Sequence, residues 1–361
     1  MLVSKRLATR HASDINSSQS ALFSKLFKKF QLTKATVCIC CLVLAVWCLW
    51  GFYLTEADPW LTIVHNWQIS VTMLFGSFVA GATSEGGGAV AFPVFTKLLH
   101  VDPQDAKVFS LAIQSVGMTS ASLLIILLRI PVDWRVIRWA SLGGIGGIIL
   151  GGIVLAPIIS PVITKMLFTV IVTSFVVTLF VLNRGIQLRH QQLPVLGWTE
   201  RILLILFGFV GGIVSSLVGN GIDIITFSLM VLLFRISEKV ATPTSVVLMA
   251  LNAVVGFLLY LFVLDGFTEQ VKAYWLAAVP VVVVGAPLGA LLCSKMSRQM
   301  IAKMLMGLIA VELISTLLII QFNTQLIIVS LLAFACLSCV YYLMYRTDFY
   351  HRIPIKENNS H

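Results

Sequence analysis

The sequence predicts an all-α polytopic membrane protein, with about eight full transmembrane helices arranged in two inverted repeats. Hydrophobic residues make up 58% of the chain and charged residues only 11%, whereas an ordinary soluble domain carries roughly 25% charged residues. Long apolar runs recur, and most approach the ~20 residues that cross ~30 Å of hydrocarbon. Two shorter apolar passages are broken by polar, glycine-rich sequences, which align when the chain is slid along itself until Gly76 falls on Gly211. We call this offset the repeat shift.

The apolar runs divide the chain into segments. They lie at about 35–54, 105–129, 136–158, 162–183, 201–218, 239–264, 273–293, 301–320 and 323–345. We expect a basic cytoplasmic tail (1–34), an extra N-terminal transmembrane helix (35–54), a first repeat (67–184), a second repeat (200–320), a last transmembrane helix (323–345) and a cytoplasmic tail (346–361). Each repeat is expected to hold a broken helix hairpin followed by three spans.

The N-terminal tail is too long and hydrophilic for the start of a signal peptide. Within it, "ALFSKLFKKF" (21–30) places leucines and phenylalanines on one helical face and lysines on the other. This pattern suits a short amphipathic helix lying on an anionic leaflet. A disordered basic tail is the alternative.

The distribution of basic residues predicts the topology. Lys and Arg are dense before 35, between 129 and 138, between 184 and 201, between 295 and 303, and after 345. Because cytoplasmic loops carry an excess of Lys and Arg, we place these segments and both termini in the cytoplasm of a multi-pass cell inner-membrane protein. The net charge of +10 is therefore explained by topology, and no nucleic-acid partner is expected.

No cofactor, metal site or enzymatic activity is expected. The seven cysteines all fall inside apolar segments, where they read as small packing or lipid-facing side chains. The chain has no HExxH and no GxSxG motif and no paired aspartates in facing spans, which disfavours an intramembrane enzyme. A membrane scaffold or sensor is disfavoured because no soluble output domain is present.

The repeat brings the two breaks into register. Under the repeat shift, "SEGGG" (84–88) falls on "GNGID" (219–223), and Ala106 and Ser110 fall on Ala241 and Ser245. The charge pattern gives the two copies opposite orientations. Inverted repeats with helices interrupted at equivalent positions are typical of secondary transporters.

The segments after the breaks, 86–99 and 221–234, are too short to span the bilayer, because each is only about 21 Å long as a helix. We therefore interpret them as half-helices of re-entrant hairpins, whose free backbone N–H groups and helix dipoles attract an anion. Glycines let a ligand approach that backbone closely. Polar edges of the following spans would complete the cavity, or else form helix-to-helix hydrogen bonds. The candidate substrate-binding residues are Thr83, Ser84, Gly86, Gly87, Ser110, Gln114, Ser215, Ser216, Gly219, Asn220, Gly221, Thr244, Ser245 and Asn252.

Two carboxylates beside the breaks are candidates for proton coupling or gating. An ionisable residue inside the membrane is costly and is a functional candidate by default. Glu85 is the stronger candidate, and a helix N-terminal cap is its alternative. Asp223 could equally be a first-turn acid stabilised by the helix dipole. In contrast, the glycines of "GGIGGIILGG" (143–152) are interpreted as a surface for close helix packing.

Two stretches of this sequence resemble the TauE/SafE sulfite exporter family of anion permeases. They are "FVAGATSEGGGAVAFPVFTKLLHVDPQDAKVFSLA" (78–112) and "FVGGIVSSLVGNGIDIITFSLMVLLFRISEKVATPTSVV" (209–247). Each has a glycine-rich turn, an apolar half-helix, a short amphipathic loop and an A-x-x-x-S ending. The resemblance covers about 70–320 and implies transport of sulfite, sulfoacetate or other small sulfur-containing or organic anions. Glu85 and Asp223 depart from the family's usual small neutral residues.

The expected function is a secondary transporter that exports a small anion, most simply sulfite or an organosulfonate. Alternating access would operate around a site between two re-entrant helix tips. An anion channel of the same fold and an importer of a sulfur oxyanion are the alternatives. The expected partners are the small anion and the lipid bilayer, and a homodimer is left open.

Overall fold

The computed structural model describes residues 36–52, 63–84, 95, 101–182, 189–319 and 324–347. Every regular element within these residues is a helix. The elements are α3 (Trp67–Ala82), α5 (Pro103–Leu127), α6 (Trp134–Leu150) with the π-helical turn η2 (Gly151–Leu155), α7 (Pro161–Leu182), α8 (Trp198–Val218), α9 (Ile222–Ser228) with the π-helical turn η3 (Leu229–Leu233), α10 (Glu238–Phe262), α11 (Glu269–Lys295), α12 (Arg298–Ile319) and α13 (Thr324–Arg346). A further helix covers Thr36–Phe52. The all-helical prediction is therefore confirmed for the part of the chain described.

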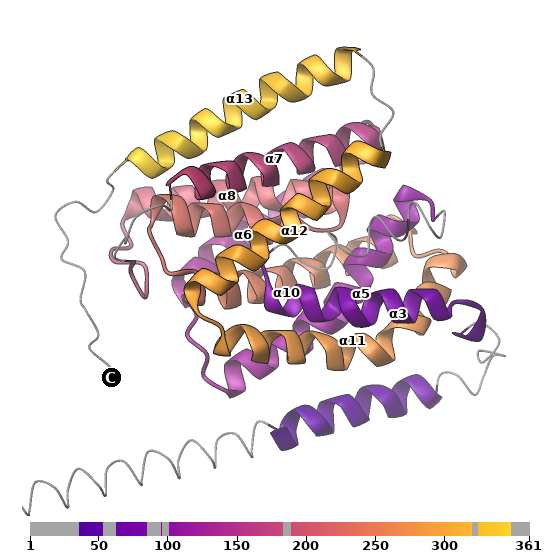
Figure 1. Ribbon diagram of the computed structural model, residues 1–361. Coiled ribbons are helices and arrows are strands. Elements are labelled where there is room, and N and C mark those ends of the chain that lie inside the picture. The colour runs from indigo at the N-terminus through magenta and orange to yellow at the C-terminus, as the bar shows by residue number, and fades with distance from the viewer. Residues whose placement is uncertain are drawn as a thin grey trace, which may run out of the picture.

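Eight of the described helices are long and apolar enough to cross a membrane, as the sequence predicted. The shorter apolar helices are Thr36–Phe52, Trp67–Ala82 and the continuous segment Ile222–Leu233. Figure 1 shows most helices gathered in one bundle, with α13 along one flank and the Thr36–Phe52 helix along the opposite flank. The other described helices lie between these two outer helices.

The outer helices make different contacts with the bundle. The indole N–H groups of Trp47 and Trp50 donate to the carbonyls of Pro280 and Leu276, at 3.0 and 2.8 Å, so the N-terminal helix is attached to α11. Helix α13 packs on α7, yet only 6% of its most apolar window is buried within the protein. An apolar helix with so little cover is suited to contact with lipid.

The bounds of the helices follow the repeat shift found in the sequence. Helices α5 and α10 each contain 25 residues, and the shift places the first residue of α5, Pro103, on the first residue of α10, Glu238. It likewise places Trp134, which begins α6, on Glu269, which begins α11. The packing repeats as well, because α3 packs on α11 as α8 packs on α6. Helix bounds and helix packing therefore both support an internal repeat.

Glycines allow these helix pairs to approach at backbone distance. A Cβ atom added to Gly143, Gly147 or Gly208 would come within 2.0 to 2.1 Å of a carbonyl oxygen on the facing helix of the α6–α8 pair. Gly81 and Gly289 make equally close contacts between α3 and α11, at 2.0 and 1.9 Å. Small residues at such crossings are typical of membrane helices. The packing interpretation of the 143–152 glycines is confirmed.

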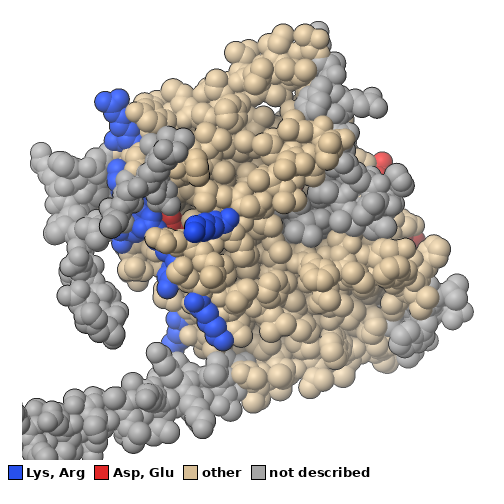
Figure 2. All heavy atoms as spheres, viewed as in Figure 1, with Lys and Arg blue, Asp and Glu red and all other residues tan. Residues whose placement is uncertain are grey.

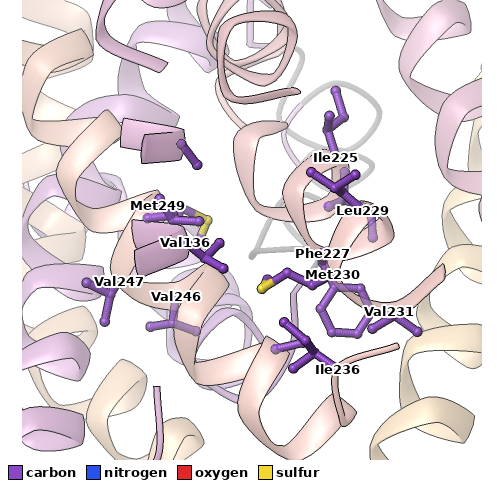
Figure 3. Close-up of a cluster of buried hydrophobic side chains, with 14 of the residues drawn as sticks. Val136, Ile225, Phe227, Leu229, Met230, Val231, Ile236, Val246, Val247 and Met249 are labelled. Carbon is purple, nitrogen blue, oxygen red and sulfur yellow. The ribbon is translucent and has the colours of Figure 1, made fainter. Parts of the chain in front are cut away.

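The main core surrounds the short α9–η3 segment. Phe227, Met230 and Val231 of this segment are completely buried and cluster with Val246 and Met249 of α10 (Figure 3). A short helix thus lies within the main core, which both halves of the chain help to form. The longer helices around it provide its cover.

Charged side chains are segregated along the bundle. Figure 2 shows Lys and Arg gathered at one end, with uncharged residues covering most of the flank. At this end, Arg298 at the start of α12 contacts Glu238 at the start of α10, with 2.6 Å between Nε and Oε2. Arg235 donates to the carbonyl of Tyr345, near the end of α13, at 3.1 Å. This polarity agrees with the predicted excess of basic residues on one side of the membrane.

Candidate functional site

The chain breaks between α8 and α9 at Gly219 and Gly221. Gly219 has φ +95° and ends α8 in the left-handed conformation, and Gly221 has φ +155°. Side chains rarely adopt either conformation, which explains why glycine occupies both positions. A Cβ on Gly219 would also lie 2.7 Å from the Cβ of Ser110. The predicted interruption at "GNGID" therefore exists and presses against α5.

After the break, the chain returns to the end at which α8 began. The amide of His190, which precedes α8, donates to the carbonyl of Arg235, which follows η3, at 2.8 Å. The amide of Ser237 donates back to His190 at 2.8 Å. Burial, with a smaller contribution from Arg235, lowers the pKa of His190, so this imidazole is neutral at physiological pH. These contacts close the base of an α8–α9 hairpin.

The returning half of the hairpin is enclosed by protein. The seven residues of α9 and the five of η3 are all buried, and together they extend only about 18 Å as a helix. A segment of this length cannot cross ~30 Å of hydrocarbon. Its free backbone groups need partners inside the protein, because lipid offers none.

Two of the N–H groups at the hairpin tip have partners within the tip. The amide of Ile222 donates to Ser215 Oγ at 3.0 Å, and the amide of Gly221 donates to Asp223 Oδ1 at 2.9 Å. Asp223 thus lies in the first turn of α9 and accepts a hydrogen bond at the positive end of the helix. This geometry matches the prediction of a first-turn acid.

Two predicted polar residues of α5 hold the other side of the tip. Ser110 Oγ and Gln114 Nε2 both donate to the carbonyl oxygen of Gly219, at 3.2 and 3.1 Å. Gln114 Nε2 also donates to Ser110 Oγ at 2.6 Å. The Oε1 atom of Gln114 is buried with no partner among the described residues. The amide group therefore joins α5 to the end of α8 and retains an unused acceptor.

A cavity adjoins this contact, and its volume of about 640 Å³ includes space that is open to solvent. Three of the predicted site residues line it: Ser110 and Gln114 from α5, and Asn220 from the hairpin tip. Residues of α3, α7 and α11 complete its wall, including Ser77, Lys165 and Val282. The structure thus brings the second break and the polar edge of α5 to one cavity.

Lys165 is the charged member of the described cavity wall, and the sequence reasoning did not select it. Lys165 is 6% exposed and pairs with the completely buried carboxylate of Glu312 on α12. The hydroxyls of Thr169 and Thr316 each lie 3.4 Å from Glu312 Oε1. The sequence did offer a signal for each residue, because Lys165 and Glu312 are charged residues inside the apolar runs 162–183 and 301–320. Nothing in the sequence pairs the two residues.

The other candidate residues lie outside the described cavity lining. Ser216 accepts from Tyr260 Oη through its carbonyl at 3.2 Å, and Thr244 Oγ1 accepts from the amide of Asp133 at 3.0 Å. Ser245 donates to the carbonyl of Thr242 at 2.8 Å, and Asn252 Oδ1 has no partner among the described residues.

The first break is only partly described. Thr83 donates to the carbonyl of Val79 at 3.0 Å, and Ser84 Oγ is buried with no partner among the described residues. Glu85, Gly86 and Gly87 lie outside the described residues, as does the rest of the 86–99 half-helix apart from Phe95.

The described part of the chain contains no group of three His, Cys, Asp or Glu residues that could hold a metal ion.

Comparison with known proteins identifies the family. A family model described as sulfite exporter TauE/SafE matches residues 69–316, which include both breaks, α5, α10 and the helices around the cavity. No curated protein and no solved structure matches the chain. The family match covers well over half of the 361 residues. The chain therefore belongs to the TauE/SafE sulfite exporter family of membrane transporters for sulfur-containing anions.

Proposed function

We propose that this protein exports sulfite, or a related sulfonate, from the cytoplasm by alternating access through the cavity beside the α8–α9 hairpin. The protein would lie in the cell inner membrane with both termini in the cytoplasm. In this proposal, the hairpin is re-entrant, and a counterpart around Glu85 approaches from the opposite side as part of an inverted repeat. The substrate site then lies between the two halves of the repeat.

The cavity at the second break carries this proposal. Polar residues of α5 and of the hairpin tip line it together with Lys165. A small oxyanion requires this combination of positive charge and N–H or O–H donors. Export is also favoured electrically, because an inside-negative potential contributes roughly 2.3 kcal/mol per charge per 100 mV.

The helix bounds support alternating access over a simple channel. The repeat shift matches the starts of equivalent helices in the two halves, and the second half contains a buried broken hairpin. In transporters with inverted repeats, the broken helices hold the substrate while one repeat moves against the other. In this proposal, Asp223 in the first turn of α9 and Glu85 at the predicted first break are the candidate gating residues.

Counterflow in proteoliposomes tests the proposal. Vesicles loaded with sulfite, sulfate, thiosulfate, sulfoacetate or taurine are expected to accumulate labelled sulfite only when the internal solute is a substrate. Uptake should saturate with sulfite concentration. Conductance without counterflow would show a channel, and no anion-dependent flux would refute the proposed function.

A substitution in the cavity provides the matched test. Gln114→Met places at this position the residue that the second repeat has at the equivalent position, Met249. We expect a roughly tenfold weaker apparent affinity for sulfite, because the change removes the buried hydrogen bonds that hold the hairpin tip to α5 beside the cavity. Gln68→Met, on the exposed surface of α3, is the control and should behave as wild type. Equal sulfite affinity in both variants would contradict this use of the cavity.

A further inference from the structure

The ion pair between Lys165 and Glu312 joins the cavity to a buried negative charge. The Lys165 side chain lines the cavity, whereas Glu312 lies behind it on α12 and is completely buried. Lys165 comes from α7, in the first repeat, and Glu312 from the second. Lys165 therefore contributes both to the cavity wall and to the ion pair with this counter-ion.

The positions equivalent to Lys165 and Glu312 under the repeat shift hold no ion pair. Under the repeat shift, Lys165 falls on Met300 and Glu312 on Val177. Both equivalents are apolar and well exposed, at 54% and 41%. A buried ion pair is a poor source of stability, because desolvation offsets most of the attraction. The pair lies beside the cavity. Neither the internal repeat nor a need for stability explains why a buried ion pair occurs there.

We propose that Lys165 is the cation that binds the transported anion, and that Glu312 is an internal anion which the substrate displaces. This inference rests on the proposed function and assigns the charged part of its site. When the substrate takes the ammonium group, Glu312 is left as an uncompensated buried carboxylate. Such a charge is strongly disfavoured, so Glu312 takes up a proton from water as the anion binds. The proton leaves when the anion leaves and the ion pair forms again.

The surroundings of Glu312 are suited to this exchange. Its charged partner is Lys165, from α7, and the other groups on its carboxylate are the hydroxyls of Thr169, from α7, and Thr316, from α12 itself. Its Oε2 atom is buried with no partner among the described residues. A proton on Oε2 therefore breaks no described hydrogen bond.

Three variants separate this role from a structural one. Lys165→Met removes the cation with an apolar side chain of similar length, Glu312→Gln removes the competing charge, and the double variant removes both. Lys165→Met should weaken sulfite binding by roughly tenfold to a thousandfold, as loss of a buried charge partner does. Glu312→Gln should bind sulfite more tightly than wild type. The double variant should recover thermal stability, because no charge is left unpaired, and should still fail to bind.

Titration calorimetry of the purified protein with sulfite measures affinity and proton uptake together. Repeating the titration in buffers of different ionisation enthalpy, at an alkaline pH at which free sulfite is already the dianion, should give about one proton taken up per anion bound by wild type. Glu312→Gln should take up none. Thermal unfolding of each variant without sulfite reports its folding separately.

Each outcome of these titrations decides the inference. A double variant that binds sulfite as wild type does would show a purely structural pair and would overturn it. Binding by wild type without proton uptake would overturn it as well. If wild type binds none of the five sulfur compounds named above, the proposed function itself fails. If wild type and Lys165→Met bind equally, only the role of Lys165 fails.

Discussion

Single glycines determine how closely the helices of this bundle pack. Gly147 of α6 faces the backbone of α8, where an added Cβ would lie 2.0 Å from the carbonyl oxygen of Phe209. Gly147→Ala should therefore lower the free energy of unfolding by about 1–3 kcal/mol, because the helices must move apart. The neighbouring Gly146→Ala is the control, since its Cβ would meet only the Phe209 ring at 3.6 Å. Alanine also favours helix over glycine.

Thermal unfolding in detergent measures both glycine variants. We expect a lower midpoint for Gly147→Ala and an unchanged or higher midpoint for Gly146→Ala. Equal midpoints would mean that α6 and α8 can separate at little cost. Weaker sulfite binding by the control would show instead that this helix face has a role beyond packing.

The residues whose placement the sequence indicated are those that a short local pattern sets apart. Gly219 and Gly221 were selected because glycine tolerates a tight break, and both have positive φ. Ser110 and Gln114 were selected because they share one helical face, and they line one cavity. Lys165 and Glu312 were not selected, because their pairing depends on how α7 packs against α12, which no local pattern encodes. Glu85 stays a prediction.

The α8–α9 hairpin depends on the cap that Asp223 provides. Asp223 Oδ1 accepts from the amide of Gly221, and an asparagine can keep this hydrogen bond, whereas a leucine cannot. Asp223→Leu should lower the free energy of unfolding by about 1–3 kcal/mol, because a buried N–H loses its partner. Asp223→Asn should retain both stability and sulfite counterflow. The measurements are thermal unfolding and proteoliposome counterflow as a function of pH.

The pH profile separates the two roles predicted for Asp223. If the carboxylate only caps α9, Asp223→Asn keeps the wild-type dependence of counterflow on pH. If Asp223 carries the coupled proton, this variant loses that dependence even though it folds. The second result would identify Asp223 at the hairpin tip, instead of Glu312, as the residue that carries the coupled proton.

The helices themselves were largely predictable, because a span needs a long apolar run and a break needs polar or glycine residues. The predicted run 239–264 corresponds to α10 at Glu238–Phe262, and the predicted break corresponds to the turn between α8 and α9. The two π-helical turns, η2 and η3, were not predicted. A π-turn adds one residue between hydrogen-bonded groups, and its position depends on packing more than on hydrophobic period.

The arrangement of the whole molecule depends on which helices pack against each other. The internal repeat was the one sequence feature that indicated which helices are equivalent. The repeat shift relates α5 to α10 and α6 to α11, but it does not say that α3 packs on α11, which lies far along the chain. Shape complementarity between glycine-rich helix faces decides that pairing. The segregation of Lys and Arg to one end (Figure 2) follows directly from loop composition and was predictable.

An inverted repeat makes a testable statement about pairs of equivalent residues. Trp134 and Glu269 are the first residues of α6 and α11, are matched by the repeat shift, and are both exposed. If the repeats are inverted, a cysteine at one position faces the cytoplasm and a cysteine at the other faces the opposite side. Each cysteine would be placed in a variant whose seven native cysteines are replaced, and a membrane-impermeant thiol reagent would be applied to whole cells.

We expect Glu269→Cys to react in intact cells and Trp134→Cys to react only after the membrane is opened. The basic residues explain the direction, because Arg135 and Arg138 follow Trp134 closely, whereas the loop before Glu269 carries the acidic Asp265. Thermal unfolding and sulfite counterflow of both variants confirm that they are folded and active. Reaction of both cysteines from the same side would rule out the inversion. The α8–α9 hairpin and the predicted first hairpin would then approach the cavity from one face, and alternating access by exchange of equivalent halves would lose its structural basis.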